Sequence, residues 1–287
     1  MNTLQAVILG IVQGLSEFLP ISSSAHLVFT SNIYSVLTGA EINAESAQQA
    51  FLSIMLHLGT LIAIFIYFRT ELWNITKAFF KALYKKDFSS TDAKLGLYII
   101  IGTFFTVAIA YPLKEITEKL LVYPQLVAFL LILTGFVLFF SEFKSKHFNN
   151  SSNKNELDIK KSILIGIAQG LAVFPGFSRS GWTIATGLFL GLDRVKSTRF
   201  SFLLVVPIIL GTSIFYPILE IQPSELASYN WCAIIIGTIV SGIVGYFCIK
   251  YFLKFVERFS MNFFAYYCII AGLMVISFFT GLQLGAS

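Results

Sequence analysis

The sequence EFLPISSSAH, residues 17–26, places a carboxylate, three consecutive hydroxyls and an imidazole in a segment that is otherwise almost wholly apolar. Residues 4–18 and 23–36 on either side of the break are suited to helices, and Pro20 ends the first of them. Each helix is too short to cross a hydrocarbon core of about 30 Å, which needs roughly 17–25 apolar residues. The stretch therefore predicts a helical hairpin that enters and leaves a membrane on one side.

The composition of the whole chain indicates an integral membrane protein. Of its 287 residues, 56% are hydrophobic and 12% are charged, against roughly 45–50% and 25% in a soluble domain. Six runs are long enough to span a bilayer: 51–68, 95–112, 121–140, 200–219, 231–249 and 263–282. The polar stretches 69–94 and 141–162 are expected to be loops. Residues 1–287 should thus form a single all-α polytopic domain.

The distribution of Lys and Arg predicts the orientation. No basic residue precedes Arg69, and the basic residues then cluster in alternate loops, at 69–94, 144–161, 194–199 and 250–258. Such loops are cytoplasmic by the positive-inside rule. Both termini are therefore expected outside, and the net charge of +5 reflects topology rather than binding of nucleic acid.

The first hairpin has a copy later in the chain. Setting residue n against n+156 without gaps matches the pairs Gly10/Gly166, Ile11/Ile167, Gln13/Gln169, Gly14/Gly170, Leu15/Leu171, Phe18/Phe174, Ser22/Ser178, Ser24/Ser180 and Thr30/Thr186. A weaker match pairs LGT at 58–60 with LGT at 210–212. The copy consists of the short runs 163–174 and 180–191, and three spans separate it from the first hairpin, so the two hairpins should enter from opposite faces.

The prediction is an inverted internal repeat with two re-entrant hairpins. Repeat one covers about 1–140, repeat two about 160–287, and a cytoplasmic linker covers about 141–162. Inverted repeats with broken helices place a polar site near the bilayer midplane. The glycines Gly10, Gly14, Gly166 and Gly170 are expected to serve close helix packing, as are Gly237, Ser241 and Gly245 in the fifth span.

The ionisable residues of the hairpins need another explanation, because a charge at membrane depth costs at least about 2.5–3.5 kcal/mol. In PGFSRSGWT, residues 175–183, Arg179 lies between Ser178 and Ser180 at the start of a helix. Backbone N–H groups, the helix dipole and a guanidinium together form an anion site that suits phosphate. Alternatively, Arg179 pairs with Glu17 across the repeat interface; both hold if such a pair opens to admit phosphate.

The first hairpin has the groups for phosphoryl hydrolysis. Gln13 and Glu17 are four residues apart and share a helix face. Glu17 either holds a divalent cation or acts as a base, and His26 or a serine either attacks phosphorus or positions a water molecule. A site among lipid-facing helices suggests a phosphate on a lipid tail. His57, inside the first span, is either a packed residue or a cavity-lining one.

The motifs GIVQGLSEFLPISSSAH, residues 10–26, and FPGFSRSGWT, residues 174–183, resemble those of the bacitracin-resistance type of undecaprenyl-diphosphatase over nearly the whole chain. The resemblance implies hydrolysis of undecaprenyl diphosphate to undecaprenyl phosphate and inorganic phosphate, which recycles the lipid carrier of bacterial cell-wall synthesis and confers bacitracin resistance. It implies a plasma-membrane enzyme that uses Mg²⁺ or Ca²⁺, with its site facing outward. The roles implied are catalysis for Glu17, Ser22, Ser23, His26 and Arg179, phosphate binding for Gly176, Ser178, Arg179, Ser180 and Thr183, and metal binding for Gln13 and Glu17.

Two residues depart from the family pattern. Gln13 is the amide variant of the glutamate motif, so metal binding would rest mainly on Glu17, and Cys268 stands where relatives often carry an arginine after a tyrosine. The alternative function is a transporter or flippase of polyprenyl phosphates, since that class also uses inverted repeats with broken helices. The expected partners are a lipid diphosphate and the membrane, with a homodimer as one alternative and no nucleic acid.

Overall fold

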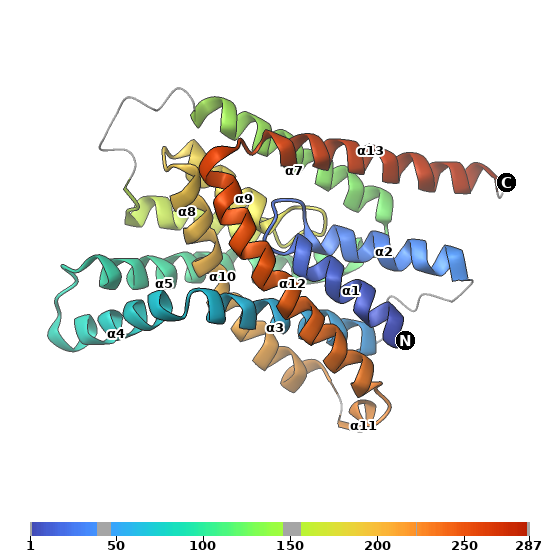
Figure 1. Ribbon diagram of the computed structural model, residues 1–287, viewed down its shortest axis with the longest axis horizontal. Helices are drawn as coiled ribbons and strands as arrows, with labels where there is room; N and C mark the ends of the chain where they lie inside the picture. Colours follow the sequence, from blue (N-terminus) through green and yellow to red (C-terminus); the bar gives the residue numbers. More distant parts are fainter. Residues whose placement is uncertain (1, 39–46, 146–155, 222, 286–287) are drawn as a thin grey trace.

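The computed structural model describes residues 2–38, 47–145, 156–221 and 223–285, and these residues are almost entirely helical (Figure 1). The centre of the predicted linker, 146–155, lies outside them. In chain order the helices are α1 Thr3–Ser16, α2 Ser23–Thr38, α3 Ala47–Tyr67, α4 Arg69–Lys85, α5 Thr91–Ala110, the 3₁₀ turn η1 Tyr111–Leu113, α6 Lys114–Leu120, α7 Pro124–Ser145, α8 Ile159–Leu171, α9 Arg179–Phe189, α10 Arg194–Glu220, α11 Pro223–Leu226, α12 Trp231–Arg258 and α13 Asn262–Gly285.

Six helical stretches of the described chain are long and apolar enough to cross a membrane, and they coincide with the six predicted spans. They are Gln48–Tyr67, Thr91–Thr117, Pro124–Ser145, Arg194–Glu220, Trp231–Arg258 and Asn262–Gly281. The helices α1, α8 and α9 have 14, 13 and 11 residues and fall short of a bilayer crossing. The protein is therefore a multi-pass helical membrane protein.

The expectation of a loop at 69–94 was wrong for residues 69–85, which form α4. The segment is rich in polar residues, but its apolar residues recur at helical spacing. Ile75 and Ala82, seven residues apart on one face, are buried, while Lys77 and Lys81 are exposed. The apolar face packs against α5, where a Cβ added at Gly96 would lie 3.3 Å from Ile75 Cγ2.

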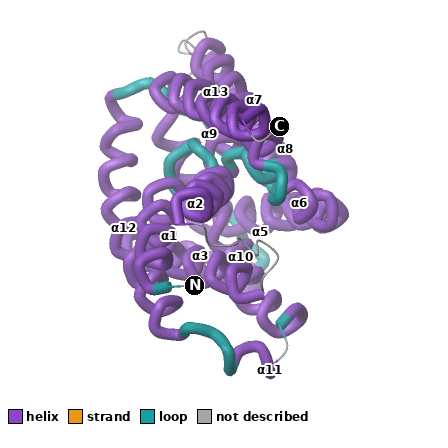
Figure 2. The backbone as a smooth tube through the Cα atoms, turned by 90° about the vertical axis from the view of Figure 1, so that its right-hand side faces the viewer, coloured by secondary structure: helices purple, strands orange, loops and turns teal. Residues whose placement is uncertain are grey.

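The helices form two flanks around the centre of the molecule. In Figure 2, α1 and α12 lie on one flank and α5 and α8 on the other. A Cβ added at Gly10 of α1 would lie 2.6 Å from the Gly237 carbonyl oxygen of α12, and one at Gly166 of α8 would lie 2.3 Å from the Gly102 carbonyl oxygen of α5. The predicted packing role of these helix glycines is thus confirmed.

The α1–α2 turn is fixed to the core by Phe18. This side chain is fully buried, and its ring meets the Phe202 ring of α10 edge-on with centroids 5.2 Å apart. Aromatic pairs of this geometry add about 0.5–1.5 kcal/mol to the free energy gained by burial alone. Because Phe18 directly follows Glu17, this packing holds the carboxylate at a defined place near the middle of the bundle.

Candidate active site

Glu17 lies at the C-terminal end of α1 and is 5% exposed. Its Oε2 accepts hydrogen bonds from Gln13 Nε2 at 2.9 Å and from the Ser23 hydroxyl at 2.7 Å. The predicted sharing of a helix face by Gln13 and Glu17 is confirmed. The turn thus brings the Ser23 hydroxyl into direct contact with the Glu17 carboxylate. In this geometry the carboxylate can accept the proton of the hydroxyl.

The turns that precede α2 and α9 share a capping geometry. The Ser22 hydroxyl accepts from the Ala25 N–H at 3.3 Å, and the Ser178 hydroxyl accepts from the Gly181 N–H at 3.1 Å. Ser22 has a φ of 69°, a left-handed conformation that is strained for a residue with a side chain. Each capping hydroxyl lies 3.2 Å from a second one, in the pairs Ser22–Ser24 and Ser178–Ser180.

The two turns contact each other in the interior. Arg179 Nη2 donates to Glu17 Oε1, so the alternative in which Arg179 pairs with Glu17 is confirmed. The Ser180 hydroxyl donates to the Leu19 carbonyl oxygen at 2.9 Å. Glu17 Oε2 therefore accepts a hydrogen bond from Ser23, in the first turn of α2, and Glu17 Oε1 accepts one from Arg179, in the first turn of α9.

In a second ion pair, Arg194–Glu142, both oxygens of the buried carboxylate accept hydrogen bonds. Arg194 Nε lies 3.0 and 3.1 Å from the two oxygens of the fully buried Glu142, which also accepts from the Met261 N–H at 3.2 Å. Arg179, in contrast, contacts Glu17 through Nη2, and its buried Nη1 makes no hydrogen bond to any described residue. An unmet donor of this kind is costly in isolation and suits an anionic ligand.

The Arg179–Glu17 pair lines a cavity of about 260 Å³. Its polar lining residues are Ser16, Glu17, Ser23, Ser24, His57, Thr106, Gln169, Ser178, Arg179, Ser180 and Thr212, and its apolar lining residues are Ala110, Ala172, Val173, Phe177, Val205, Ile208 and Ile209. Glu17 is the single carboxylate among these lining residues. Within the described chain, no group of three or more His, Cys, Asp or Glu residues is arranged to hold a metal ion.

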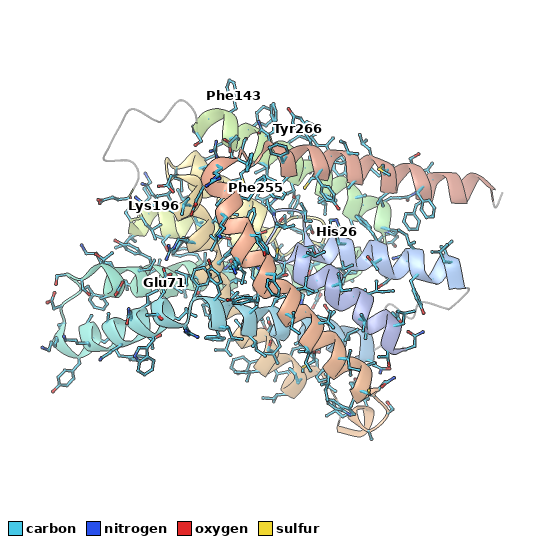
Figure 3. All side chains as sticks on the ribbon, viewed as in Figure 1. His26, Glu71, Phe143, Lys196, Phe255 and Tyr266 are labelled. Atoms are coloured by element: carbon cyan, nitrogen blue, oxygen red, sulfur yellow. The ribbon has the colours of Figure 1, made fainter. Side chains whose placement is uncertain are left out.

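His26 lies at the start of α2 (Figure 3) but does not line this cavity. Its Nδ1 is 2.8 Å from the Ser22 carbonyl oxygen, which can only accept, so Nδ1 carries the proton. In the neutral ring Nε2 then accepts from the Tyr267 hydroxyl at 2.7 Å. The two rings also stack, with centroids 5.7 Å apart, so His26 joins the first turn to α13.

His57 occupies the place in the cavity that the sequence suggested for His26. Its Nδ1 donates to the Ser53 carbonyl oxygen at 2.7 Å, which directs Nε2 to within 3.5 Å of Glu17 Oε2. The side chain is 30% exposed and lines the cavity. Of the two interpretations of His57, cavity lining is therefore confirmed.

Gly176 and Thr183 support the second turn without lining the cavity. Gly176 has a φ of 103°, and a Cβ there would lie 2.2 Å from the Val127 carbonyl oxygen, so both backbone conformation and space require glycine. Thr183 is fully buried, with its hydroxyl 2.6 Å from that of Ser201. Ser22, at 2% exposure, also lies outside the cavity lining.

Several site residues were missed by sequence reasoning. Tyr267 and the buried Cys268, whose thiol donates to the Pro20 carbonyl oxygen at 3.4 Å, reach the first turn from α13. Thr106 and Gln169 contact each other at 3.1 Å across the cavity wall. Gln169 had an available signal, since it matches Gln13 in the repeat, and so did Tyr267 and Cys268, which stand where relatives often carry a tyrosine and an arginine. Thr106 had none, because the sequence does not reveal how its helix packs.

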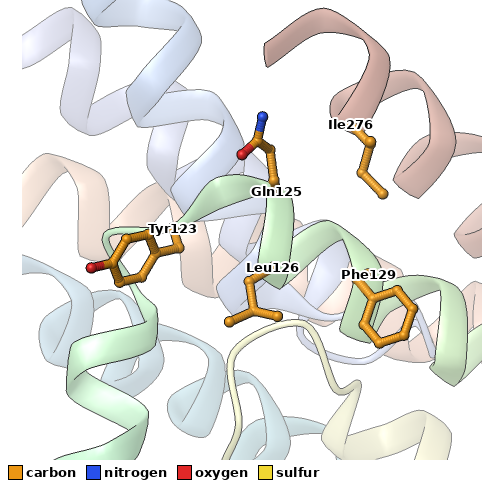
Figure 4. A pocket seen from close by; sticks show the side chains of 5 residues that line it. All are labelled: Tyr123, Gln125, Leu126, Phe129 and Ile276. Atoms are coloured by element: carbon orange, nitrogen blue, oxygen red, sulfur yellow. The ribbon is translucent and has the colours of Figure 1, made fainter. Parts of the chain in front are cut away.

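A larger hollow of about 480 Å³ lies between the start of α7 and α13 and is a different kind of feature (Figure 4). Its lining residues are Tyr123, Gln125, Leu126, Phe129 and Ile276. It is wide open, and none of these five side chains is acidic or basic. The chemistry-bearing groups are therefore in the smaller cavity.

The fold and the site define the class of the protein: a polytopic helical membrane protein in which two helix–turn–helix segments meet around a buried, incompletely satisfied Arg–Glu pair. The chain matches the family model described as "Bacitracin resistance protein BacA" over residues 6–274, and it belongs to this family.

Relatives align with the chain over almost its whole length. It is 36% identical to the undecaprenyl-diphosphatase of Methanosphaera stadtmanae over 288 residues, covering 96% of this chain and 98% of the relative. It is 36% identical to undecaprenyl-diphosphatase 1 of Pseudoalteromonas translucida, covering 98% and 100%, and 37% identical to the undecaprenyl-diphosphatase of Methanobrevibacter smithii, covering 96% and 97%.

Proposed function

We propose that this protein hydrolyses undecaprenyl diphosphate to undecaprenyl phosphate and inorganic phosphate. The observation that carries the proposal is the buried Arg179, which has one unmet donor beside Glu17 and Ser23 in the same cavity. The names of the relatives support it. Recycling of the lipid carrier for cell-wall synthesis, and with it bacitracin resistance, follows from this reaction.

Arg179 is proposed to bind the terminal phosphate. Nη1 is available at once, and opening of the contact with Glu17 frees Nη2, so the planar fork then holds two phosphate oxygens. The N-terminus of α9 adds its dipole and the hydroxyls of Ser178 and Ser180, which line the cavity. These contacts stabilise the charge that develops on the phosphate oxygens in the transition state.

The contact between Ser23 and Glu17 supports a nucleophilic serine. Ser23 Oγ attacks the terminal phosphorus as its proton passes to Glu17, and the bond from that phosphorus to the bridging oxygen breaks, releasing the lipid monophosphate. Water then hydrolyses the phosphoserine, which restores Ser23 and releases phosphate. Both ring nitrogens of His26 are engaged, so we assign His26 to holding the turn from which Ser23 projects.

The residues of the site fit a divalent cation that is bound together with the substrate. Mg²⁺ is commonly held by one or two carboxylates plus substrate phosphates, and Glu17 is one carboxylate beside the proposed phosphate position. Gln13 Oε1 is buried beside Glu17 and has no hydrogen-bond partner among the described residues, but Gln13 does not line the cavity, so the cation would be held mainly by Glu17. Bound Mg²⁺ or Ca²⁺ would neutralise charge on the diphosphate.

We further propose that both helix–turn–helix segments are re-entrant hairpins of an inverted repeat. The reciprocal packing of α1 on α12 and α8 on α5, each short helix against a long helix of the other half, supports this arrangement. The N-terminus of α1 and the end of α13 lie on one side of the molecule and the α4–α5 turn on the other (Figure 1). With the basic loops cytoplasmic, both termini face outward, and the resemblance to the family implies that the site opens to the same side.

Cysteine labelling tests this orientation. Single cysteines in 220–230 should react with a membrane-impermeant reagent from outside, and single cysteines at 86–90, between α4 and α5, should react only after the membrane is permeabilised. Labelling of 220–230 from the cytoplasm would refute both the orientation and the inverted repeat.

Phosphate release by purified protein in detergent tests the reaction, because no transport can occur there and a pure flippase would be inactive. Arg179→Lys keeps the charge but loses the fork, and should lower kcat/KM by at least about 10²-fold. Arg194→Lys is the matched control, since it alters the saturated pair outside the cavity and should retain turnover per folded molecule. Equal turnover in the two variants would refute the phosphate-binding role of Arg179.

A further inference from the structure

Two positions on one face of α10 have different surroundings. Leu204 touches α5, since a Cβ added at Gly102 would lie 2.8 Å from Leu204 Cδ1. Gly211 lies seven residues further along the same face, yet a Cβ added there would meet no other described atom within 4 Å. The helices α5 and α10 therefore touch at Gly102 and are apart near Gly211.

The opening has a structural cause and a defined limit. Pro207 lies inside α10 between the two positions, where the missing N–H and the proline ring favour a bend of the helix. Near the end of α10, Lys114 Nζ and Glu220 Oε1 approach to 2.6 Å and reconnect the two sides. We call the opening bounded by Gly102–Leu204 and Lys114–Glu220 the α5–α10 window.

The window adjoins an uncharged, mainly aliphatic part of the active-site cavity wall. Ala110 of α5 and Ile208, Ile209 and Thr212 of α10 line the cavity on this side. Val173, which stands in the repeat where Glu17 stands in the first hairpin, is 37% exposed against 5% for Glu17. The cavity thus has a charged end at Glu17 and Arg179 and an uncharged end that leads toward the lipid.

We propose that the hydrocarbon tail of the lipid diphosphate leaves the cavity through the α5–α10 window. This inference rests on the proposed function. A cavity of about 260 Å³ is smaller than the roughly 300–1,000 Å³ that encloses a drug-sized ligand, so most of a polyprenyl tail must lie outside it. With the diphosphate on Arg179, the first isoprene units pack against Ile208 and Ile209.

Gly211→Phe tests the window by filling it, with Gly281→Phe as the matched control. Gly281 lies in α13 and also has no described atom within 4 Å of an added Cβ, so both variants place a phenyl ring in open space on an apolar helix. Hydrolysis of farnesyl diphosphate and of dimethylallyl diphosphate is measured in detergent. We expect Gly211→Phe to lower kcat/KM about tenfold for farnesyl diphosphate and by no more than about twofold for dimethylallyl diphosphate.

Gly281→Phe should leave both values unchanged. Wild-type kinetics on farnesyl diphosphate in Gly211→Phe, or equal losses on both substrates, would overturn the window. Photolabelling of wild-type protein with a farnesyl diphosphate that carries a terminal diazirine is independent of the variant's folding and should mark residues 205–219. Label confined to α7 or α13 would overturn the inference, whereas a wild type inactive on every diphosphate would refute the proposed function instead.

Discussion

The two halves of the molecule begin with matching sequences but pack differently. In the first half, α3 lies tightly against α12, and a Cβ added at Gly59 would lie 2.3 Å from the Thr238 carbonyl oxygen. In the second half, the matching LGT places Gly211 on α10, where an added Cβ meets open space. A small residue therefore allows close helix packing at Gly59 but not at Gly211. The reason is that α12 lies directly beside Gly59, whereas no described atom of a neighbouring helix lies within 4 Å of a Cβ added at Gly211.

The chemistry is divided between the halves in the same way. Glu17 of the first hairpin corresponds to Val173 of the second, while Ser23 corresponds to Arg179. Ser23 and Arg179 both donate hydrogen bonds to Glu17. Position 173 carries valine, which cannot accept equivalent hydrogen bonds in the second half. A sequence repeat in which counterparts have diverged thus yields one charged site with an apolar exit rather than two equal sites.

Each turn is also braced by the last helix of the opposite half. In the second turn, the Ser178 N–H donates to the Thr134 hydroxyl of α7 at 3.1 Å. In the first turn, the Tyr267 hydroxyl of α13 donates to His26. The two contacts occupy equivalent positions in the two halves, but one joins a backbone N–H to a threonine hydroxyl and the other joins a tyrosine hydroxyl to an imidazole. Each contact can therefore be removed by a separate substitution.

The largest effect is expected for Ser23→Ala, which removes the proposed nucleophile from the charged half. Turnover should fall by more than about 10³-fold, and a phosphorylated protein trapped by acid quenching of the wild type should disappear. Ser24→Ala is the matched control, because Ser24 also lines the cavity but contacts Ser22 rather than Glu17. If Ser24→Ala loses the phosphoprotein and Ser23→Ala keeps it, the assignment of the nucleophile is wrong.

Glu17→Gln should lower turnover by at least about 10²-fold, since the amide keeps the size but loses the negative charge and the ability to accept a proton. Excess Mg²⁺ should not restore activity. Adding Val173→Glu to this variant moves the carboxylate to the matching position of the other half, in the wall of the same cavity, and should not restore turnover because position 17 is the one that Ser23 and Arg179 contact. Recovery of turnover in the double variant would mean that the two halves are interchangeable.

Tyr267→Phe tests the brace on the first turn. The substitution keeps the ring that stacks on His26 and removes the hydroxyl that donates to Nε2. Loss of one hydrogen bond should lower kcat roughly two- to tenfold with little change in KM, because the turn is loosened while Arg179 is untouched. A rise in KM at unchanged kcat would assign Tyr267 to substrate binding.

The smallest effect is expected in the free energy of unfolding, when Gly59→Ala is compared with Gly211→Ala. The methyl group at Gly59 collides with backbone and should destabilise by about 1–3 kcal/mol. At Gly211 it meets no obstacle and should be neutral or stabilise by up to about 1 kcal/mol, since alanine favours helix. Thermal unfolding in detergent measures both; similar shifts would mean that the halves are equally packed.

The sequence by itself determined the elements that depend on short-range spacing and composition. The lengths of apolar runs predicted the six long helices, the i, i+4 spacing predicted the Gln13–Glu17 contact, and the helix glycines predicted close packing. It failed at 69–85, where polarity concealed an amphipathic helix. The pairing of Glu17 with Arg179 was among the alternatives because both residues stood out against an apolar background.

Only the tertiary structure decided which side chains share the cavity. His26 and His57 look alike in sequence, yet α13 engages His26 with Tyr267, while the Ser53 carbonyl group directs His57 toward Glu17. Likewise, Arg179 and Arg194 both pair with a buried glutamate, and only the three-dimensional contacts reveal that one pair is saturated and the other is not. These contacts join residues far apart in the chain, and no local pattern of apolar and polar residues encodes the packing angles that create them.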